Sequence, residues 1–151
     1  MQPIYKNLLL LSIAFILITS AILVKKNPVV GTWKITSGKH NGTAAPQFMM
    51  DRTQSFDKHN TFQSIIKTSE GKEVIANSGK FHLINDTTMV TYHKNQSGKL
   101  DNVANTYNFR IQNDSMHFYG FYLSQMPGNP SLINKVFIDE WWVKADQKKK
   151  E

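Results

Sequence analysis

The chain has 151 residues, no cysteine and a formal net charge of +7 at pH 7. This length allows one domain, and the lack of cysteine excludes both a disulfide framework and a lipid-modified cysteine. Charge is nearly balanced between Val30 and Lys144, with 12 Lys and Arg against 9 Asp and Glu in dispersed positions, which argues against a nucleic-acid partner.

The N-terminal residues 1–24 have the pattern of an export segment. An apolar run of 17 residues, 8–24, follows Lys6. Small residues at Thr19, Ser20 and Ala21 favour a cleaved signal peptide, whereas the length of the run is enough for a helix to nearly span a bilayer as a signal anchor. Both alternatives predict an exported protein of the periplasm or cell envelope, and the second would tether it to the membrane through residues 8–24.

A short linker, 25–29, leads into the first predicted strand, 29–36, in which Trp33 and Ile35 share one face. Residues 37–51 contain Gly38, Gly42 and Pro46 and predict a large loop. One helical turn within it would present Phe48, Met49 and Met50 on one side. Apolar residues at a loop tip need a surface to lie on, and we expect this turn to form a lid over the mouth of a barrel.

Four further strands are predicted at 52–56, 61–68, 74–84 and 87–94, separated by short polar turns. In the second of them, Phe62, Ser64 and Ile66 alternate with Gln63, Ile65 and Lys67, which is the two-residue period of a strand. Gly79 lies in the middle of the third strand, and it predicts a bulge or a sharp bend there.

Residues 102–123 predict a long hairpin, whose first strand alternates Tyr107 and Phe109 with polar residues. The turn Asn113, Asp114 and Ser115 has short side chains that tolerate left-handed backbone angles. An irregular connection is predicted at 124–134, then a last strand at 135–144. The tail, 145–151, is basic and predicted to be disordered and solvated, with attraction to an anionic membrane as the alternative.

The domain 30–144 thus contains eight predicted strands joined mainly by short turns, with no helix longer than one turn. The pattern favours an all-β, eight-stranded antiparallel up-and-down barrel, because closure removes the exposed edges of a sheet. A sandwich of two sheets is the alternative.

Several residues resemble those of lipocalins and related calycins. Gly31, Thr32 and Trp33 match the short motif that opens the first lipocalin strand, and a large loop follows it as in that family. Asp114 matches the family's turn between the sixth and seventh strands. Lys144 stands where lipocalins place an arginine against the first-strand tryptophan, and the helix that follows the lipocalin barrel has no counterpart. The resemblance implies a shortened relative, similar to uncharacterised exported bacterial domains, with the tryptophan plugging one end.

The expected interior is aromatic, and its volume decides the function. Eight strands leave room either for side chains alone or for one small ligand. A filled interior and a modest apolar cavity beneath the lid are both open. In the second case we expect non-catalytic binding of a small, largely apolar molecule, without a cofactor. The ligand-binding residues would be Trp33, Phe48, Met49, Phe62, Phe81, Tyr107, Phe109 and Trp142.

Polar residues support a catalytic or metal site only weakly. Asp139 and Glu140 are adjacent, so one should face the interior, where Arg110 or Lys144 would be its partner. A buried structural pair is favoured over an enzyme that uses either carboxylate. The five histidines show no metal-ligand spacing, although His82 and His117 could hold haem if they pointed inward.

The strand 116–123 is apolar on both faces, so one apolar face must lie outside the barrel. We expect the connection 124–134 to cover it, or a partner or second subunit to pack on it. The second possibility gives the alternative function, an interaction or oligomerisation module with a filled core.

Overall fold

The computed structural model describes residues 27–95, 97–126 and 129–145. The predicted export segment and most of the predicted tail therefore lie outside the described residues. Within the described ranges, no helix is long and apolar enough to cross a membrane.

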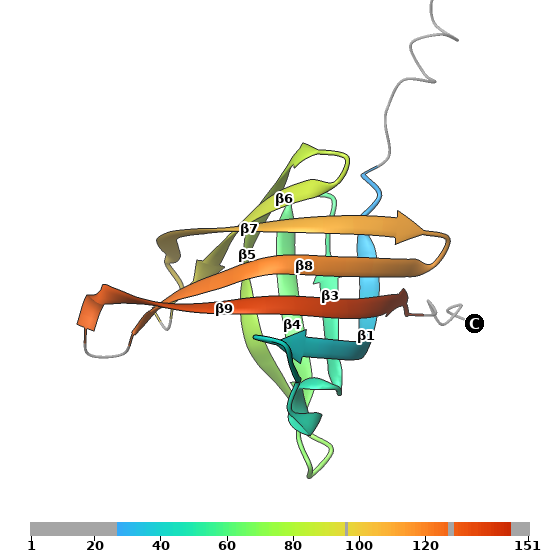
Figure 1. The fold of residues 1–151 in the computed structure, drawn as a ribbon, viewed down its shortest axis with the longest axis horizontal. Helices are drawn as coiled ribbons and strands as arrows, with labels where there is room; N and C mark the ends of the chain where they lie inside the picture. The colour runs from blue at the N-terminus through green and yellow to red at the C-terminus, as the bar shows by residue number, and fades with distance from the viewer. Residues whose placement is uncertain (1–26, 96, 127–128, 146–151) are drawn as a thin grey trace, which may run out of the picture.

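The described chain forms one closed antiparallel sheet (Figure 1). Nine strands pair in the order β2-β1-β3-β4-β5-β6-β7-β8-β9, and β1 also pairs with β9. Because β2 is only a two-residue extension, eight strands form the wall, which confirms the predicted barrel and excludes the sandwich. The elements are β1 (Gly31–His40), β2 (Thr43–Ala44), the 3-10 turn η1 (Gln47–Met49), β3 (Arg52–Phe56), β4 (Thr61–Lys67), β5 (Glu73–Asn85), β6 (Thr88–Lys94), β7 (Leu100–Gln112), β8 (Ser115–Met126) and β9 (Asn129–Lys144).

Turn chemistry explains several of the short connections. Asn41, Asn60 and Asn113 adopt positive φ angles of 49°, 60° and 54°, a conformation that asparagine tolerates better than most residues. Asn113 lies between β7 and β8, where Gln112 pairs with Ser115. The predicted hairpin and its turn are confirmed.

Two connections are more regular than predicted. The first strand continues to His40, so the loop before β3 begins only at Asn41. The predicted irregular connection 124–134 is instead a continuation of β8 and β9, with Ser124 opposite Asn134 and Gln125 opposite Ile133. This ribbon projects beyond the barrel (Figure 1), and its exposed side chains need no alternation of polar and apolar residues.

Gly79 has a different role from the predicted bulge. The register shift in this region lies between Ser64 and Ile65 of β4, opposite Asn77 and Ile75, so that Ala76 is the extra residue. At Gly79 a Cβ atom would come within 2.0 Å of the Tyr92 carbonyl oxygen and 2.9 Å of the Phe62 ring. Glycine is therefore required for close approach of β5 to its neighbours.

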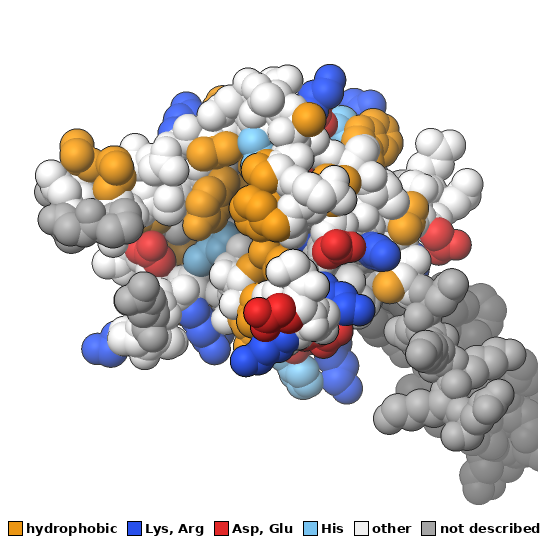
Figure 2. All heavy atoms as spheres, turned by 90° about the horizontal axis from the view of Figure 1, so that it is seen from below, with side chains coloured by type: hydrophobic (Ala, Val, Ile, Leu, Met, Phe, Trp, Pro, Cys, Tyr) orange, Lys and Arg blue, Asp and Glu red, His pale blue; other side chains and the backbone are white. Residues whose placement is uncertain are grey.

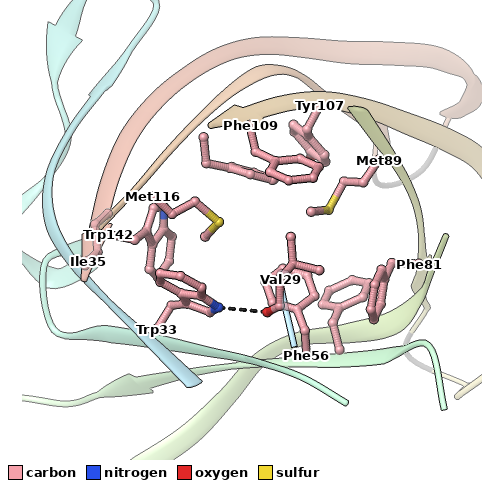
Figure 3. Close-up of a cluster of buried hydrophobic side chains, with 12 residues drawn as sticks. Val29, Trp33, Ile35, Phe56, Phe81, Met89, Tyr107, Phe109, Met116 and Trp142 are labelled. Atoms are coloured by element: carbon pink, nitrogen blue, oxygen red, sulfur yellow. Dashed lines mark hydrogen bonds between the residues drawn. The ribbon is translucent and has the colours of Figure 1, made fainter. Parts of the chain in front are cut away.

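One end of the interior is filled by large apolar side chains (Figure 3). The indole Nε1 of Trp33 donates a hydrogen bond of 2.8 Å to the carbonyl oxygen of Val29, so the linker before β1 plugs this end. Lys144 places its Nζ 5.7 Å from the centre of the Trp33 ring, within cation–π range, as the resemblance to lipocalins implied. The other members of this core are Ile35, Phe56, Phe62, Phe81, Met89, Tyr107, Phe109, Met116, Phe118 and Trp142.

Candidate functional site

The other part of the interior contains a cavity of about 340 Å³. Seen from the side of η1 and the β4–β5 turn, hydrophobic side chains gather around a hollow in which histidine atoms are visible (Figure 2). The apolar and aromatic lining comes from Met49, Phe62, Ile66, Ala76, Tyr107, Phe118, Tyr122, Val136 and Ile138. The polar lining comes from His40, Arg52, Gln54, Asn77, Thr91, His93 and Glu140.

Strand alternation explains why charged residues line this cavity. On β3, Arg52, Gln54 and Phe56 share a face, and both Arg52 and Phe56 are buried. On β1 the register shifts between Ile35 and Ser37. This irregularity changes the inward positions from the odd residues Trp33 and Ile35 to even residues, and it thereby turns His40 inward.

An ion-pair cluster lies in the wall of the cavity. Glu140 is 1% exposed, and its Oε1 accepts hydrogen bonds from Arg52 Nη2 and, at 3.1 Å, from His40 Nε2. The Arg52 guanidinium also lies over the Trp142 ring, 4.9 Å from its centre. Gly38, opposite Glu140, leaves room for this carboxylate, because a Cβ there would approach its Cγ to 3.2 Å.

The partners expected for the inward carboxylate were wrong. Alternation predicted that either Asp139 or Glu140 faces inward, and the inward residue is Glu140, but neither Arg110 nor Lys144 reaches it. Arg110 is exposed on the outer face of β7, and Lys144 lies over Trp33 at the plugged end. The cation that reaches Glu140 comes from Arg52, because closure of β1 onto β9 brings β3 within reach. The result is a buried pair whose charges compensate one another.

Burial keeps two further lining groups neutral. The pKa of His93 is lowered to about 4 because the ring is removed from water, while the Asp101 carboxylate acts in the opposite direction. Its ring packs edge-on against Phe62 and Tyr122, with centroids 5.1 and 5.3 Å away. Burial also raises the pKa of the Tyr107 phenol. At neutral pH both side chains act as uncharged hydrogen-bonding groups.

The eight predicted ligand-binding residues fall into three groups. Met49, Phe62 and Tyr107 line the cavity. Trp33, Phe81, Phe109 and Trp142 face inward as expected, but they pack in the apolar core and are absent from the cavity lining. Phe48 is 63% exposed, because η1 turns Met49 rather than its neighbour toward the mouth. The predicted helical turn of this loop is confirmed as the 3-10 turn Gln47–Met49.

The polar half of the lining was missed. Alternation from Phe56 and Phe62 places Arg52, Gln54 and Ser64 on inner faces, but charged and polar residues in strands are usually read as solvent-facing. The predicted inward carboxylate of Asp139 or Glu140 could have indicated further polar lining residues, since a buried charge requires a partner.

His82 and His117, which could have held haem only if they pointed inward, lie outside the barrel. His82 is exposed and stacks on Tyr92, with ring centroids 6.1 Å apart. His117 Nε2 donates a hydrogen bond of 2.7 Å to Asp139 Oδ1 on the outer face. The inward orientation that haem ligation by these two histidines requires is therefore not observed. Within the described residues, no three His, Asp or Glu side chains are grouped as a metal site.

The outer face of β8 and β9 carries a row of aromatic side chains. The His117 ring stacks on Trp141 at 4.2 Å and on Tyr119 at 4.8 Å. Further along the strands Phe121 packs against Phe137 at 5.2 Å. The expected cover by a 124–134 loop is wrong, since these residues extend the same two strands. Phe121 and Trp141 remain 44% and 49% exposed.

No protein-family model matches the sequence, and no curated protein matches it, so the function is argued from the structure.

Proposed function

We propose that this chain is a lipocalin-like binding protein that holds a small, largely apolar molecule in the barrel without covalent chemistry. The single observation that carries this proposal is the cavity of about 340 Å³, whose size falls within the range of small-molecule sites. Its lining combines aromatic and aliphatic walls, which offer apolar contact area, with polar groups that can orient a ligand.

The driving force would be removal of apolar surface from water, worth about 25 cal/mol per Å². Phe62, Phe118 and Ile138 offer that surface on three different strands. Met49 comes from η1, where its flexible thioether side chain adapts to differently shaped ligands. The opposite end of the interior is plugged by Trp33 and Val29, so ligands would enter from the η1 side.

The test is binding of the neutral fluorescent probe N-phenylnaphthylamine, with one variant that fills the cavity and one matched control. Val136→Trp places a large ring in the cavity wall, whereas Val143→Trp makes the same change on an exposed position of the same strand. We expect probe fluorescence to rise with the native protein and the Val143 variant, and to be lost with the Val136 variant. Equal probe binding by all three proteins would contradict the proposal.

We also propose that residues 8–24 direct export of the chain. The support is the apolar run itself, preceded by Lys6. Fractionation of cells that express the full chain, with the mass of the purified protein, tests this. A cytoplasmic protein of full mass would contradict it, and the start of an exported chain would distinguish a cleaved peptide from a membrane anchor.

A second candidate function is favoured by the outer aromatic row of β8 and β9. Half-exposed Phe121 and Trp141 offer a surface for a partner or a second copy. This candidate does not require a ligand in the cavity. A protein that binds no probe is therefore compatible with the second function but not with the first.

A further inference from the structure

The cavity contains polar atoms that have no hydrogen-bond partner in the described part of the protein. They are Nε of Arg52, Oδ1 of Asn77 and Nδ1 of His93. Arg52 is only 8% exposed, so its Nε–H group is held away from bulk water. A buried polar atom without a partner is costly, and a ligand that supplies the missing hydrogen bonds is favoured over one that does not.

Two of these atoms belong to neighbouring strands. Gly79 of β5 pairs with His93 of β6, and Asn77 lies two residues before Gly79 on the same face. Asn77 and His93 are therefore diagonal neighbours on the inner wall. Arg52 comes from β3 and extends toward Glu140 on β9, so it contributes to the wall from another side.

The charges around this cavity already compensate one another. Arg52 is paired with the buried Glu140, whose Oε1 also contacts His40. His93 is neutral at pH 7 because burial lowers its pKa to about 4, and burial also disfavours ionisation of Tyr107. Tyr122, Gln54 and Thr91 complete the polar surroundings without adding a fixed charge.

We infer that the bound molecule carries an uncharged group able both to accept and to donate hydrogen bonds, such as a primary amide, on its apolar body. Arg52 Nε would donate to its oxygen, and Asn77 and His93 would accept from its N–H or O–H. This inference rests on the proposed binding function and adds the chemistry of the ligand's polar end.

A carboxylate or an ammonium group fits less well. A carboxylate would add a second buried anion near Glu140, and an ammonium would add a second cation near Arg52. Either ion would also lose its own hydration on entering the barrel. A neutral amide avoids both costs, and it offers an acceptor for Arg52 Nε and donors for Asn77 and His93.

Calorimetric titration at pH 7.5 with octanamide, octanoate and octylamine tests the inference, because these probes share one apolar chain length. We expect octanamide to bind at least about tenfold more tightly than either ion. Octanoate or octylamine binding as tightly as octanamide would overturn the inference while leaving the proposed binding function intact. If neither N-phenylnaphthylamine nor any of the three octyl compounds binds, the binding function and the inference both fail.

Variants then identify the atoms responsible. We expect Asn77→Leu and His93→Phe each to reduce the preference for octanamide over octanoate by about tenfold, while binding of N-phenylnaphthylamine is retained. Matched controls are Asn102→Leu and His82→Phe, which change exposed positions. An unchanged preference in both cavity variants, with N-phenylnaphthylamine still bound, would overturn the assignment of the polar end to these residues.

Discussion

The two ends of the barrel interior differ, although the same eight strands build both. At one end Trp33, Phe56, Phe81 and Phe109 meet across the barrel and are each at most 2% exposed (Figure 3). At the other end polar and shorter side chains alternate with aromatic rings around a cavity of about 340 Å³. An eight-stranded barrel is narrow enough for side chains to fill it. The sequence of each strand therefore decides, residue by residue, where packing ends and binding space begins.

The largest expected effect is a difference in the free energy of unfolding lost by substitutions at the two ends. Trp33→Ala should lower the free energy of unfolding by about 4 kcal/mol, because it opens a void and removes the hydrogen bond to Val29. Tyr122→Ala, a large-to-small change in the cavity wall, should cost about 2 kcal/mol or less, since one side of the ring already borders open space. Urea denaturation measures both losses of stability, and the m-values should stay unchanged. Equal losses would break the distinction between a packed end and a binding end.

The ion pair gives the next largest effect. Glu140→Ala should cost about 3 kcal/mol, because it leaves the Arg52 cation buried without its carboxylate. Asp139→Ala is the matched control on the outer face, where its pair with His117 is partly exposed and worth about 1 kcal/mol or less.

A double variant sharpens this result. Arg52→Met combined with Glu140→Leu removes both charges, and it should recover most of the stability lost by Glu140→Ala. If the double variant is as unstable as the single one, shape rather than charge compensation maintains this part of the wall.

Protonation of His93 should destabilise the cavity end as the pH falls. Its folded pKa of about 4 lies below the ordinary histidine pKa of 6.5, so between these values the unfolded chain binds more protons and stability rises with pH. Lowering the pH from 7.5 to 5 should cost about 2 kcal/mol through this residue. His93→Phe should remove that part of the pH dependence, whereas His82→Phe should retain it. Parallel stability profiles for all three proteins would contradict the burial effect.

Most of the fold followed from the two-residue period of buried strands. Phe62, Ser64 and Ile66 alternate clearly, and β4 lies where they predict it. The period fails along the ribbon of β8 and β9 beyond the barrel, because backbone pairing there is independent of a buried face. It also fails in β1, where the irregularity between Ile35 and Ser37 interrupts the alternation and the strand continues to His40.

The cavity was only partly predictable, for a different reason. Aromatic residues such as Phe62 and Tyr107 were correctly placed inside, but a list of inward aromatics does not distinguish those that fill space from those that border it. The Arg52–Glu140 pair joins residues 88 positions apart. The predicted barrel implied that the first and last strands meet, but alternation within single strands does not give the register and side-chain reach that bring Arg52 to Glu140.

The smallest expected effect tests the outside of the barrel against the inside. Phe121→Ser removes a half-exposed ring that packs on Phe137 and lies 3.9 Å from Lys135 Nζ. We expect it to change the free energy of unfolding by about 1 kcal/mol or less and to leave N-phenylnaphthylamine binding unchanged. Analytical ultracentrifugation should give the same monomeric mass for the native protein and the variant. A native dimer that dissociates in this variant would instead favour the interaction module, because the aromatic row would then contribute more between molecules than within one.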